Sequence, residues 1–418
     1  MSQVLEKTSS RSWSDAATPV KPTNSADSAV ARQLLCDSLS ADNEVQIQLD
    51  RSWPIPVLAV GAERKNTLCL GHGSQALIRK SADDLTDPAG YRQFVDTFQF
   101  LKRQLGDADF IVAHDLHPLY LSSVFARQQQ LSCLAVQHHH AHAVSCAVDA
   151  GISLPVIAVV CDGAGYGVDG ASWGGEILLA DALSCRRLGH LRYMDLPGGD
   201  AAARAPWRSA VALLAGTFGG DDFWTSLPVF HSVDPQERDI ALRQLRRRLN
   251  APRSSSLGRL FDGVAFLAGV RAHNDFEGHA AVELQRAAGE RVESPYPFDI
   301  EETADGMILD WQPLVRALAT ENSACMDVCA ISARFHATIA AMFDAVVARS
   351  VDRTGVNRIV LSGGCFANDL LRRSLVERLR RRGLHVGFHA KVPTGDGGLS
   401  LGQAVVAGAI AASGSRGQ

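Results

Sequence analysis

The chain lacks several features that would assign it to particular classes of protein. Its nine cysteines are scattered without a Cys-x-x-Cys pair, so we expect reduced thiols in a cytoplasmic protein, most of them in the core. The net charge of −4 and pI near 6.4 give no reason to expect nucleic-acid binding. No apolar run reaches the roughly 18–20 residues that span a membrane, and residues 1–13 lack the apolar centre of a signal peptide. We therefore expect neither a membrane nor a nucleic acid as a partner.

The length and composition instead favour a large folded protein. The chain has 418 residues, 46% of them hydrophobic, which is ample for a core spread over two or three domains. Residues 1–52 are polar and predict a mobile tail, with order beginning at Pro54. A pattern of strand, glycine turn, strand and strand occurs twice, about 100 residues apart, which we interpret as an internal duplication. We therefore predict two lobes, residues 53–155 and 156–412.

Alternating strands and helices predict an α/β fold. The apolar runs Val57–Gly61 and Val156–Cys161 are typical of buried strands. Gly71 and Gly73 are expected to turn between two further short strands, and residues 163–170 to form a second glycine turn. Residues 200–345 are expected to form a mostly helical insertion. In such folds the functional site lies at the carboxyl ends of the strands.

A histidine cluster at residues 137–142, Gln-His-His-His-Ala-His, predicts a metal site on a helix that continues to about Ala150. His138 and His142 are four residues apart, so on a helix their Cβ atoms lie about 5–6 Å apart on one face. Asp162 and Asp396, each beside a glycine turn, are the candidate carboxylates. Two imidazoles with one or two carboxylates leave an open position for a catalytic metal. The alternative is an incidental histidine-rich helix start.

The two remaining histidines of the cluster, His139 and His140, project onto other faces of the predicted helix. One of them could donate a hydrogen bond to a supporting carboxylate or contact a substrate.

Glycine-rich segments near strand ends predict an anion site. Without a Cβ, the backbone N–H groups can approach a phosphate closely. None of the segments matches a Walker A or Rossmann fingerprint, and each alone is equally compatible with a simple tight turn. Together they suggest a nucleotide held between the two lobes. The glycines concerned are Gly163, Gly165, Gly167, Gly174, Gly175, Gly363 and Gly364.

Two predicted helix starts add candidate nucleotide contacts. In residues 254–262, Ser254 and Gly258 could meet a phosphate, and Asp262 could meet a ribose hydroxyl. Glu277, beside a glycine, suits a ribose or a base edge. The structural alternative for all of these is a helix cap or a surface acid.

Nine segments of the sequence closely resemble the C-terminal part of HypF, a carbamoyltransferase of nickel–iron hydrogenase maturation. They occur in order from about Pro54 to Ala412 with compatible spacing. The histidine cluster and the Leu-Pro-Gly-Gly-Asp segment resemble HypF more than its relatives TsaD, TobZ and NodU. The segments are residues 115–120 (DLHPLY), 136–143 (VQHHHAHA), 162–167 (DGAGYG), 173–176 (WGGE), 196–207 (LPGGDAAARAPW), 254–262 (SSSLGRLFD), 276–281 (FEGHAA), 361–368 (LSGGCFAN) and 396–403 (DGGLSLGQ).

The resemblance implies an actin-like fold of two ribonuclease-H-like lobes with a nucleotide between them, and adds Asn368 to its contacts. It also implies one iron or zinc ion beside ATP or carbamoyl-adenylate, with Mg²⁺ as a possible companion. The carbamoyl group would pass to the C-terminal cysteine of HypE, so Cys161 and Cys365 are expected to serve packing only. The ligands implied for the metal are His138, His142, Asp162 and Asp396.

The sequence also departs from full HypF. We expect its acylphosphatase-like, zinc-finger and YrdC-like domains to be missing, because only about fifty polar residues precede the matched part. The expectation is a shortened transferase that makes carbamoyl-adenylate itself or receives it from a separate YrdC-type protein. Ala205 stands where the family usually has Glu, and Gly395 where it usually has Asn, which is expected to loosen the turn holding Asp396.

Two other functions remain open from the sequence. One is an O-carbamoyltransferase that acts on a small-molecule hydroxyl, as the resemblance to TobZ and NodU allows. The other is a non-catalytic scaffold that binds HypE and nucleotide.

Overall fold

The first strand begins earlier than the sequence predicts. The computed structural model describes residues 44–219, 223–321 and 327–414, so the expected tail at 1–43 lies outside the described residues. Residues 44–52, which the polar composition placed in that tail, instead belong to strand β1 (Glu44–Ala59). Ile47 and Leu49 are buried, because alternate residues of a strand face the same side and here that side is the core. The alternation is short and lies among polar residues, which is why the predicted start at Pro54 is wrong.

The first sheet consists of β1, β2 (Arg64–Asp84), β3 (Ile111–Asp115) and β4 (Cys133–Val136). Its strand order is β2-β1-β3-β4, with β1 and β2 antiparallel and the other pairs parallel. The turn predicted at Gly71 and Gly73 is wrong, since β2 runs through both glycines. Gly71 serves a close contact instead: a Cβ there would lie 2.1 Å from the Trp53 ring. Helices α2 (Pro88–Leu105) and α3 (Leu121–Gln128) pack on one face of this sheet.

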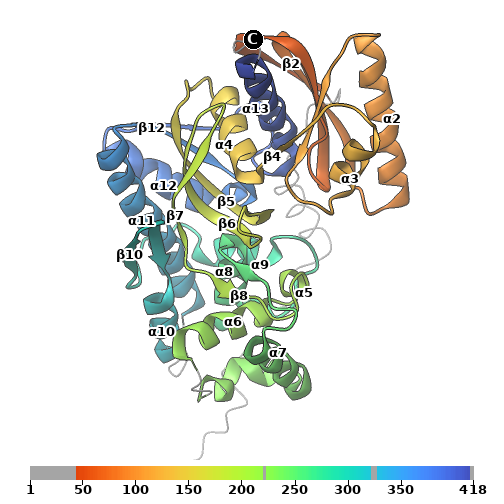
Figure 1. Cartoon of the computed structure of the whole chain (residues 1–418). Coiled ribbons are helices and arrows are strands. Elements are labelled where there is room, and N and C mark those ends of the chain that lie inside the picture. The colour runs from red at the N-terminus through yellow and green to blue at the C-terminus, as the bar shows by residue number, and fades with distance from the viewer. Residues whose placement is uncertain (1–43, 220–222, 322–326, 415–418) are drawn as a thin grey trace, which may run out of the picture. The chain divides into compact units, whose positions relative to one another are not determined.

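The other face of this sheet is covered by the last helix, α13 (Leu399–Gly414), which lies beside β2 in Figure 1. Helix α13 also packs on α4 (His138–Asp149), the helix formed by the histidine cluster as predicted. The two helices touch at backbone distance, because a Cβ on Gly402 would lie 1.9 Å from the carbonyl oxygen of Ala141. The predicted lobe boundaries remain a prediction, but residues 399–407 share a core with β1 rather than with the second sheet.

The second sheet is built around β5 (Val156–Tyr166), whose first six residues are fully enclosed as the apolar run predicted. The other strands of its main path are β6 (Ser172–Ala180), β7 (Cys185–Leu191), β10 (Asp299–Thr303), β11 (Gly306–Asp310), β12 (Arg358–Ser362) and β13 (His385–Phe388). Their order is β10-β11-β7-β6-β5-β12-β13, and β5 pairs antiparallel with β6 and parallel with β12. The predicted glycine turn starts too early: β5 continues to Tyr166 with a register shift after Cys161. Two short strands, β8 (Met194–Asp195) and β9 (Arg253–Ser254), lie off this path: β8 pairs with β9, and β9 also pairs with β6.

The described part of residues 200–345 is mostly helical, as predicted, with the hairpin β10–β11 and the short strand β9 as exceptions. Helix α11 (Val328–Thr354) is the one described helix long and apolar enough to cross a membrane, yet 72% of its most apolar stretch is buried. Phe335 and Phe343 of α11 lie in the main core, so we interpret it as a core helix. The other helices are α5 (Ala201–Arg204), α6 (Pro206–Phe218), η1 (Phe223–Ser226), η2 (Pro228–Ser232), α7 (Pro235–Arg247), α8 (Leu257–Leu267), α9 (His279–Ala288) and α10 (Gln312–Glu321).

The chain after β12 returns toward the first sheet. A single 3-10 turn, η3 (Gly364–Ala367), leads into α12 (Asp369–Arg381) and then β13. A second one, η4 (Asp396–Gly398), leads directly into α13. Two sheets with helices on their faces confirm the α/β class.

The cysteines are less buried than predicted. Seven of them lie in the described residues, all as free thiols, and three are buried: Cys69, Cys146 and Cys161. Cys133 and Cys329 are exposed.

Candidate metal and nucleotide site

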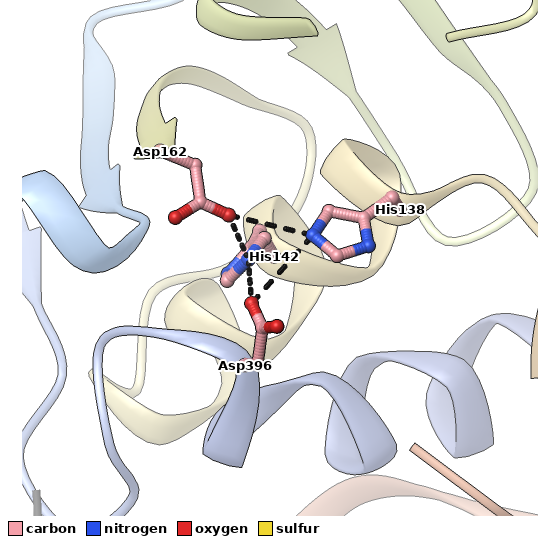
Figure 2. Close-up of side chains that lie close together, drawn as sticks. All are labelled: His138, His142, Asp162 and Asp396. Atoms are coloured by element: carbon pink, nitrogen blue, oxygen red, sulfur yellow. Dashed lines mark hydrogen bonds and ion pairs between the residues drawn. The ribbon is translucent and has the colours of Figure 1, made fainter. Parts of the chain in front are cut away.

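Four side chains from three distant segments meet where α4 begins. One ligand atom from each of His138, His142, Asp162 and Asp396 lies within 4.8 Å of the others (Figure 2). The first two project from the first turns of α4, whose start is capped because the Gln137 side chain accepts a hydrogen bond from the His140 N–H at 2.8 Å. Asp162 lies at the register shift of β5, and Asp396 opens η4. The structure thus assembles the whole predicted ligand set.

The distances within this set suit a shared cation. The Nε2 atoms of His138 and His142 each lie 3.4 Å from Asp162 Oδ2. They lie 3.7 and 3.8 Å from Asp396 Oδ1. Two ligands that are each about 2.0–2.1 Å from a tetrahedral ion lie roughly 3.4 Å apart. His142 Nε2 is moreover buried and makes no hydrogen bond, so a metal ion would satisfy an atom that the protein itself leaves unsatisfied.

The electrostatics of the set favour positive charge. Burial by itself would lower the pKa of His138, but the carboxylates of Asp115 and Asp162 raise it well above its usual value. Burial would raise the pKa of Asp162, but the imidazoles of His138 and His142 hold it well below its usual range. The carboxylates that would keep protons on the imidazoles would equally favour a cation in place of those protons.

Asp115 is a residue whose role the sequence reasoning missed. It ends β3, is completely buried, and its Oδ2 lies 2.8 Å from His138 Nδ1. Its Oδ1 accepts a hydrogen bond from the backbone N–H of His117 at 2.7 Å. A carboxylate at Nδ1 fixes that nitrogen as the protonated one and leaves the Nε2 lone pair for a metal. The signal that could have found it is an aspartate at the end of a buried strand, the first residue of the DLHPLY segment.

The backbone amides predicted to meet a phosphate are used inside the protein. The N–H of Gly364 donates to Asp162 Oδ1 at 3.1 Å, and the N–H of Gly163 donates to the same oxygen at 2.9 Å. The N–H of Gly363 donates to the Thr394 carbonyl at 2.8 Å. In this arrangement the Gly163 and Gly364 amides hold Asp162 so that its other oxygen, Oδ2, faces the histidines.

Most of the other predicted glycines serve close packing. A Cβ on Gly165 would lie 2.5 Å from ring atoms of both His138 and His139. Gly167, Gly174 and Gly175 are enclosed in the same way, since a Cβ on any of them would lie 2.2–2.5 Å from its nearest neighbouring atom. Gly163 differs, because nothing lies within 4 Å of its Cβ position. The open space at Gly163 is therefore the best candidate among these glycines for the approach of a ligand.

This difference predicts opposite behaviour for two alanine variants. We expect Gly165→Ala to lower Zn²⁺ affinity by at least about tenfold, because its methyl group must push the His138 ring out of place, as loss of ligand orientation does. Gly163→Ala is expected to keep wild-type Zn²⁺ affinity and to weaken nucleotide binding. Chelator competition measures the Zn²⁺ affinity of both variants, and nucleotide titration measures their nucleotide affinity. Equal Zn²⁺ affinities would contradict it.

The remaining nucleotide candidates are held by protein contacts. Ser254 is completely buried, and its hydroxyl accepts from the Ser256 N–H at 3.1 Å, which gives it a structural contact. Asn368 likewise caps α12 by accepting from the Leu371 N–H at 3.0 Å. Gly258 lies against Gly163, since its Cβ would be 3.1 Å from that Cα.

The two acidic candidates each have a basic partner. Asp262 lies 2.7 Å from Arg259, although burial still raises the pKa of its carboxyl to about 6. Glu277 is largely exposed and lies 3.5 Å from Lys65 Nζ. The nucleotide roles of Asp262, Glu277 and the other candidates remain predictions.

The other two histidines of the cluster stay outside the ligand set. His140 Nε2 lies 2.6 Å from the carbonyl oxygen of Asp181. The His139 ring is buried 5.7 Å from the Trp173 ring, and burial holds its pKa well below its usual value.

Two family models match the chain and together cover most of its described part. "HypF Kae1-like domain" matches residues 54–149, and "Carbamoyltransferase, Kae1-like Domain, second subdomain" matches residues 158–403. The chain belongs to the HypF family. Among relatives of that family, carbamoyltransferase HypF2 of Cupriavidus necator is 39% identical in an alignment of 391 positions that covers 86% of this chain and 47% of that protein. The carbamoyltransferase HypF homolog of the same organism is 36% identical over 84% of this chain and 91% of its own length.

A solved HypF structure confirms the fold that the resemblance implied. Full-length HypF in the phosphate- and nucleotide-bound form matches with a TM-score of 0.82 and 37% identity over 87% of this chain and 57% of that one. The two ribonuclease-H-like lobes of the actin-like fold are therefore those of HypF. Apart from the shorter homolog, the chain spans about half the length of the HypF relatives that it matches, for example 47% and 48%.

Proposed function

We propose that this protein is a metal- and nucleotide-dependent carbamoyltransferase of the cytoplasm. It passes a carbamoyl group from carbamoyl-adenylate to the C-terminal cysteine of HypE, for the cyanide ligands of nickel–iron hydrogenase. The observation that carries the proposal is the set of two buried imidazoles, the buried Asp162 carboxylate and the partly exposed Asp396 carboxylate, with ligand atoms within 4.8 Å, in a chain of the HypF family. The nucleotide is supported by the related HypF structure, which was solved in a phosphate- and nucleotide-bound form.

The transfer is an acyl substitution at the carbamoyl carbon. The thiolate sulfur of HypE attacks that carbon, the bond to the phosphate oxygen breaks, and AMP leaves with the electron pair. A bound iron or zinc ion would supply Lewis acidity to the carbonyl or phosphate oxygens. The residues of the chain orient the site: Asp115 fixes the His138 tautomer, and the Gly364 amide fixes the Asp162 carboxylate.

The nucleophile comes from the partner, so the cysteines beside the site are not needed for the reaction. Burial raises the pKa of the Cys161 and Cys365 thiols well above their usual value, which keeps both protonated and unreactive. We propose that carbamoyl-adenylate is either made by this chain or supplied by a separate YrdC-type protein.

The test is the intact mass of HypE after incubation with this protein, ATP, Mg²⁺ and carbamoyl phosphate. We expect a carbamoyl-sized increase on the C-terminal cysteine, and none on a HypE variant that lacks this cysteine. A parallel reaction that contains a YrdC-type protein separates transfer from adenylate synthesis. If the mass stays unchanged with the YrdC-type protein present, the protein is not this transferase.

A further inference from the structure

A line of buried polar groups leads away from the ligand set at His142, whereas Asp115 adjoins His138. His142 Nδ1 lies 3.1 Å from Ser362 Oγ, and Ser362 Oγ lies 2.9 Å from His389 Nε2. His389 Nδ1 in turn lies 3.5 Å from a carboxylate oxygen of Asp149, in the last turn of α4. The Ser362 side chain is fully enclosed, and those of His389 and Asp149 are at most 1% exposed. Water therefore cannot replace these contacts.

The carboxylate at one end favours one direction for the hydrogen bonds of these four groups. The Asp149 carboxylate only accepts, and it also accepts from the backbone N–H groups of Ala390, Lys391 and Val392 at 2.7–3.1 Å. Burial would raise the pKa of Asp149, but His389 and these amides hold it below its usual value, so it stays an acceptor.

Starting from Asp149, the proton positions follow for His389, Ser362 and His142 in turn. His389 Nδ1 lies 3.5 Å from the Asp149 carboxylate, an ion-pair distance that favours a proton on Nδ1. With its proton there, His389 presents the lone pair of Nε2 to the Ser362 hydroxyl. The hydroxyl donates to His389, and its oxygen accepts from Nδ1 of His142. His142 is thereby left with an Nε2 lone pair that faces the carboxylates of the ligand set.

The Asp149 carboxylate also holds the segment that carries the fourth ligand, Asp396. Its three backbone bonds fix residues 390–392, and the Thr394 carbonyl accepts from the Gly363 N–H at 2.8 Å. Asp396 follows two residues later. Asp149 thus contacts both the relay to His142 and the loop that delivers Asp396.

We propose that Asp149, through His389 and Ser362, is a positioning residue that holds His142 in its metal-binding tautomer; this inference rests on the metal site of the proposed function. The two histidines are then oriented by different devices. His138 is held by direct contact with the Asp115 carboxylate, and His142 is held by an alcohol and an imidazole in series.

The test is the Zn²⁺ affinity of the metal-free full-length protein, measured by competition with a chromogenic chelator. We expect His389→Phe, which keeps a ring without nitrogen atoms, to weaken Zn²⁺ binding by about tenfold, as loss of an outer partner of a ligand does. Ser362→Ala is expected to weaken it to a similar extent. His389→Gln keeps an acceptor and a donor at similar spacing, and we expect less than about a threefold change.

The matched control is His336→Phe. His336 is also a buried histidine, with its Nδ1 2.7 Å from the Ser332 carbonyl oxygen and Asn368 at 2.9 Å. Its replacement is expected to lower the unfolding temperature but to leave Zn²⁺ affinity unchanged.

Two outcomes would overturn the inference: wild-type Zn²⁺ affinity in both His389→Phe and Ser362→Ala, or equal losses in His389→Phe and His389→Gln. If His389→Phe does not fold, Ser362→Ala decides, since it removes only one hydroxyl. If the wild-type protein binds Zn²⁺ but does not carbamoylate HypE, the proposed transfer is wrong, whereas the positioning role of Asp149 is not affected. Failure of wild type to bind Zn²⁺ would overturn the relay together with the metal site.

Discussion

Replacement of His138 by alanine is expected to lower Zn²⁺ affinity by more than about 100-fold, the upper end of what loss of a supporting partner costs, and to abolish carbamoylation of HypE. The variant removes one of the two nitrogen ligands. It also leaves the carboxylates of Asp115 and Asp162 buried without the imidazole that separates them. Chelator competition measures the first effect and the intact mass of HypE the second.

The matched control is His140→Ala. His140 lies in the same first turns of α4 and is buried, but its Nε2 contacts the Asp181 carbonyl oxygen at 2.6 Å instead of the ligand set. We expect this variant to retain Zn²⁺ binding and transfer. Equal losses of Zn²⁺ affinity and transfer in the two variants would show that the substitutions damage helix α4 as a whole instead of removing a metal ligand. Full carbamoylation of HypE by His138→Ala would mean that the transfer does not need this ligand set.

The second large effect is expected from Gly402→Ala in α13. The added methyl group would lie 1.9 Å from the Ala141 carbonyl oxygen, so α4 and α13 must move apart. Overpacking of this kind costs about 1–3 kcal/mol or more, which exceeds the about 1 kcal/mol that alanine gains over glycine in a helix. We expect a lower free energy of unfolding together with weaker Zn²⁺ binding, because Ala141 lies between the two histidine ligands. Denaturant unfolding and chelator competition measure both.

Gly216→Ala in α6 provides the comparison. Gly216 is also a helical glycine, but the nearest atom to its Cβ position is in the Trp311 ring at 3.3 Å. The expected change in unfolding free energy is within about 1 kcal/mol of wild type. Unchanged stability and Zn²⁺ affinity in Gly402→Ala would mean that the helices can separate without cost.

The sequence predicted the local part of the site well. The histidine cluster was predicted to open a helix, and the spacing of four put His138 and His142 on one face of it. Asp162 and Asp396 could be proposed as ligands, but their meeting with α4 depends on strand order and on the return of the chain after β12. The bond from the Gly364 amide to Asp162 joins residues 202 positions apart, and no local pattern indicates it.

Glycine was the least reliable local signal. A glycine is needed both where the backbone turns with positive φ and where another group approaches too closely for a Cβ. Gly71 and Gly165 belong to the second kind, since they face the Trp53 ring and the His138 ring within strands that continue past them. Sequence alone does not distinguish these cases, because the absence of a side chain is the same in both.

The first sheet obtains its covering helix, α13, late in the synthesis of the chain. Gln403 bonds to Gly61, 342 positions earlier, within the region where α13 completes the core of the first strands. At about 5–20 residues per second, a ribosome makes the missing helix roughly 20–70 s after those strands. During that interval the face of β1 that carries Trp53 and Val57 has no covering helix. We therefore expect the yield of this protein to depend on synthesis rate and chaperone supply.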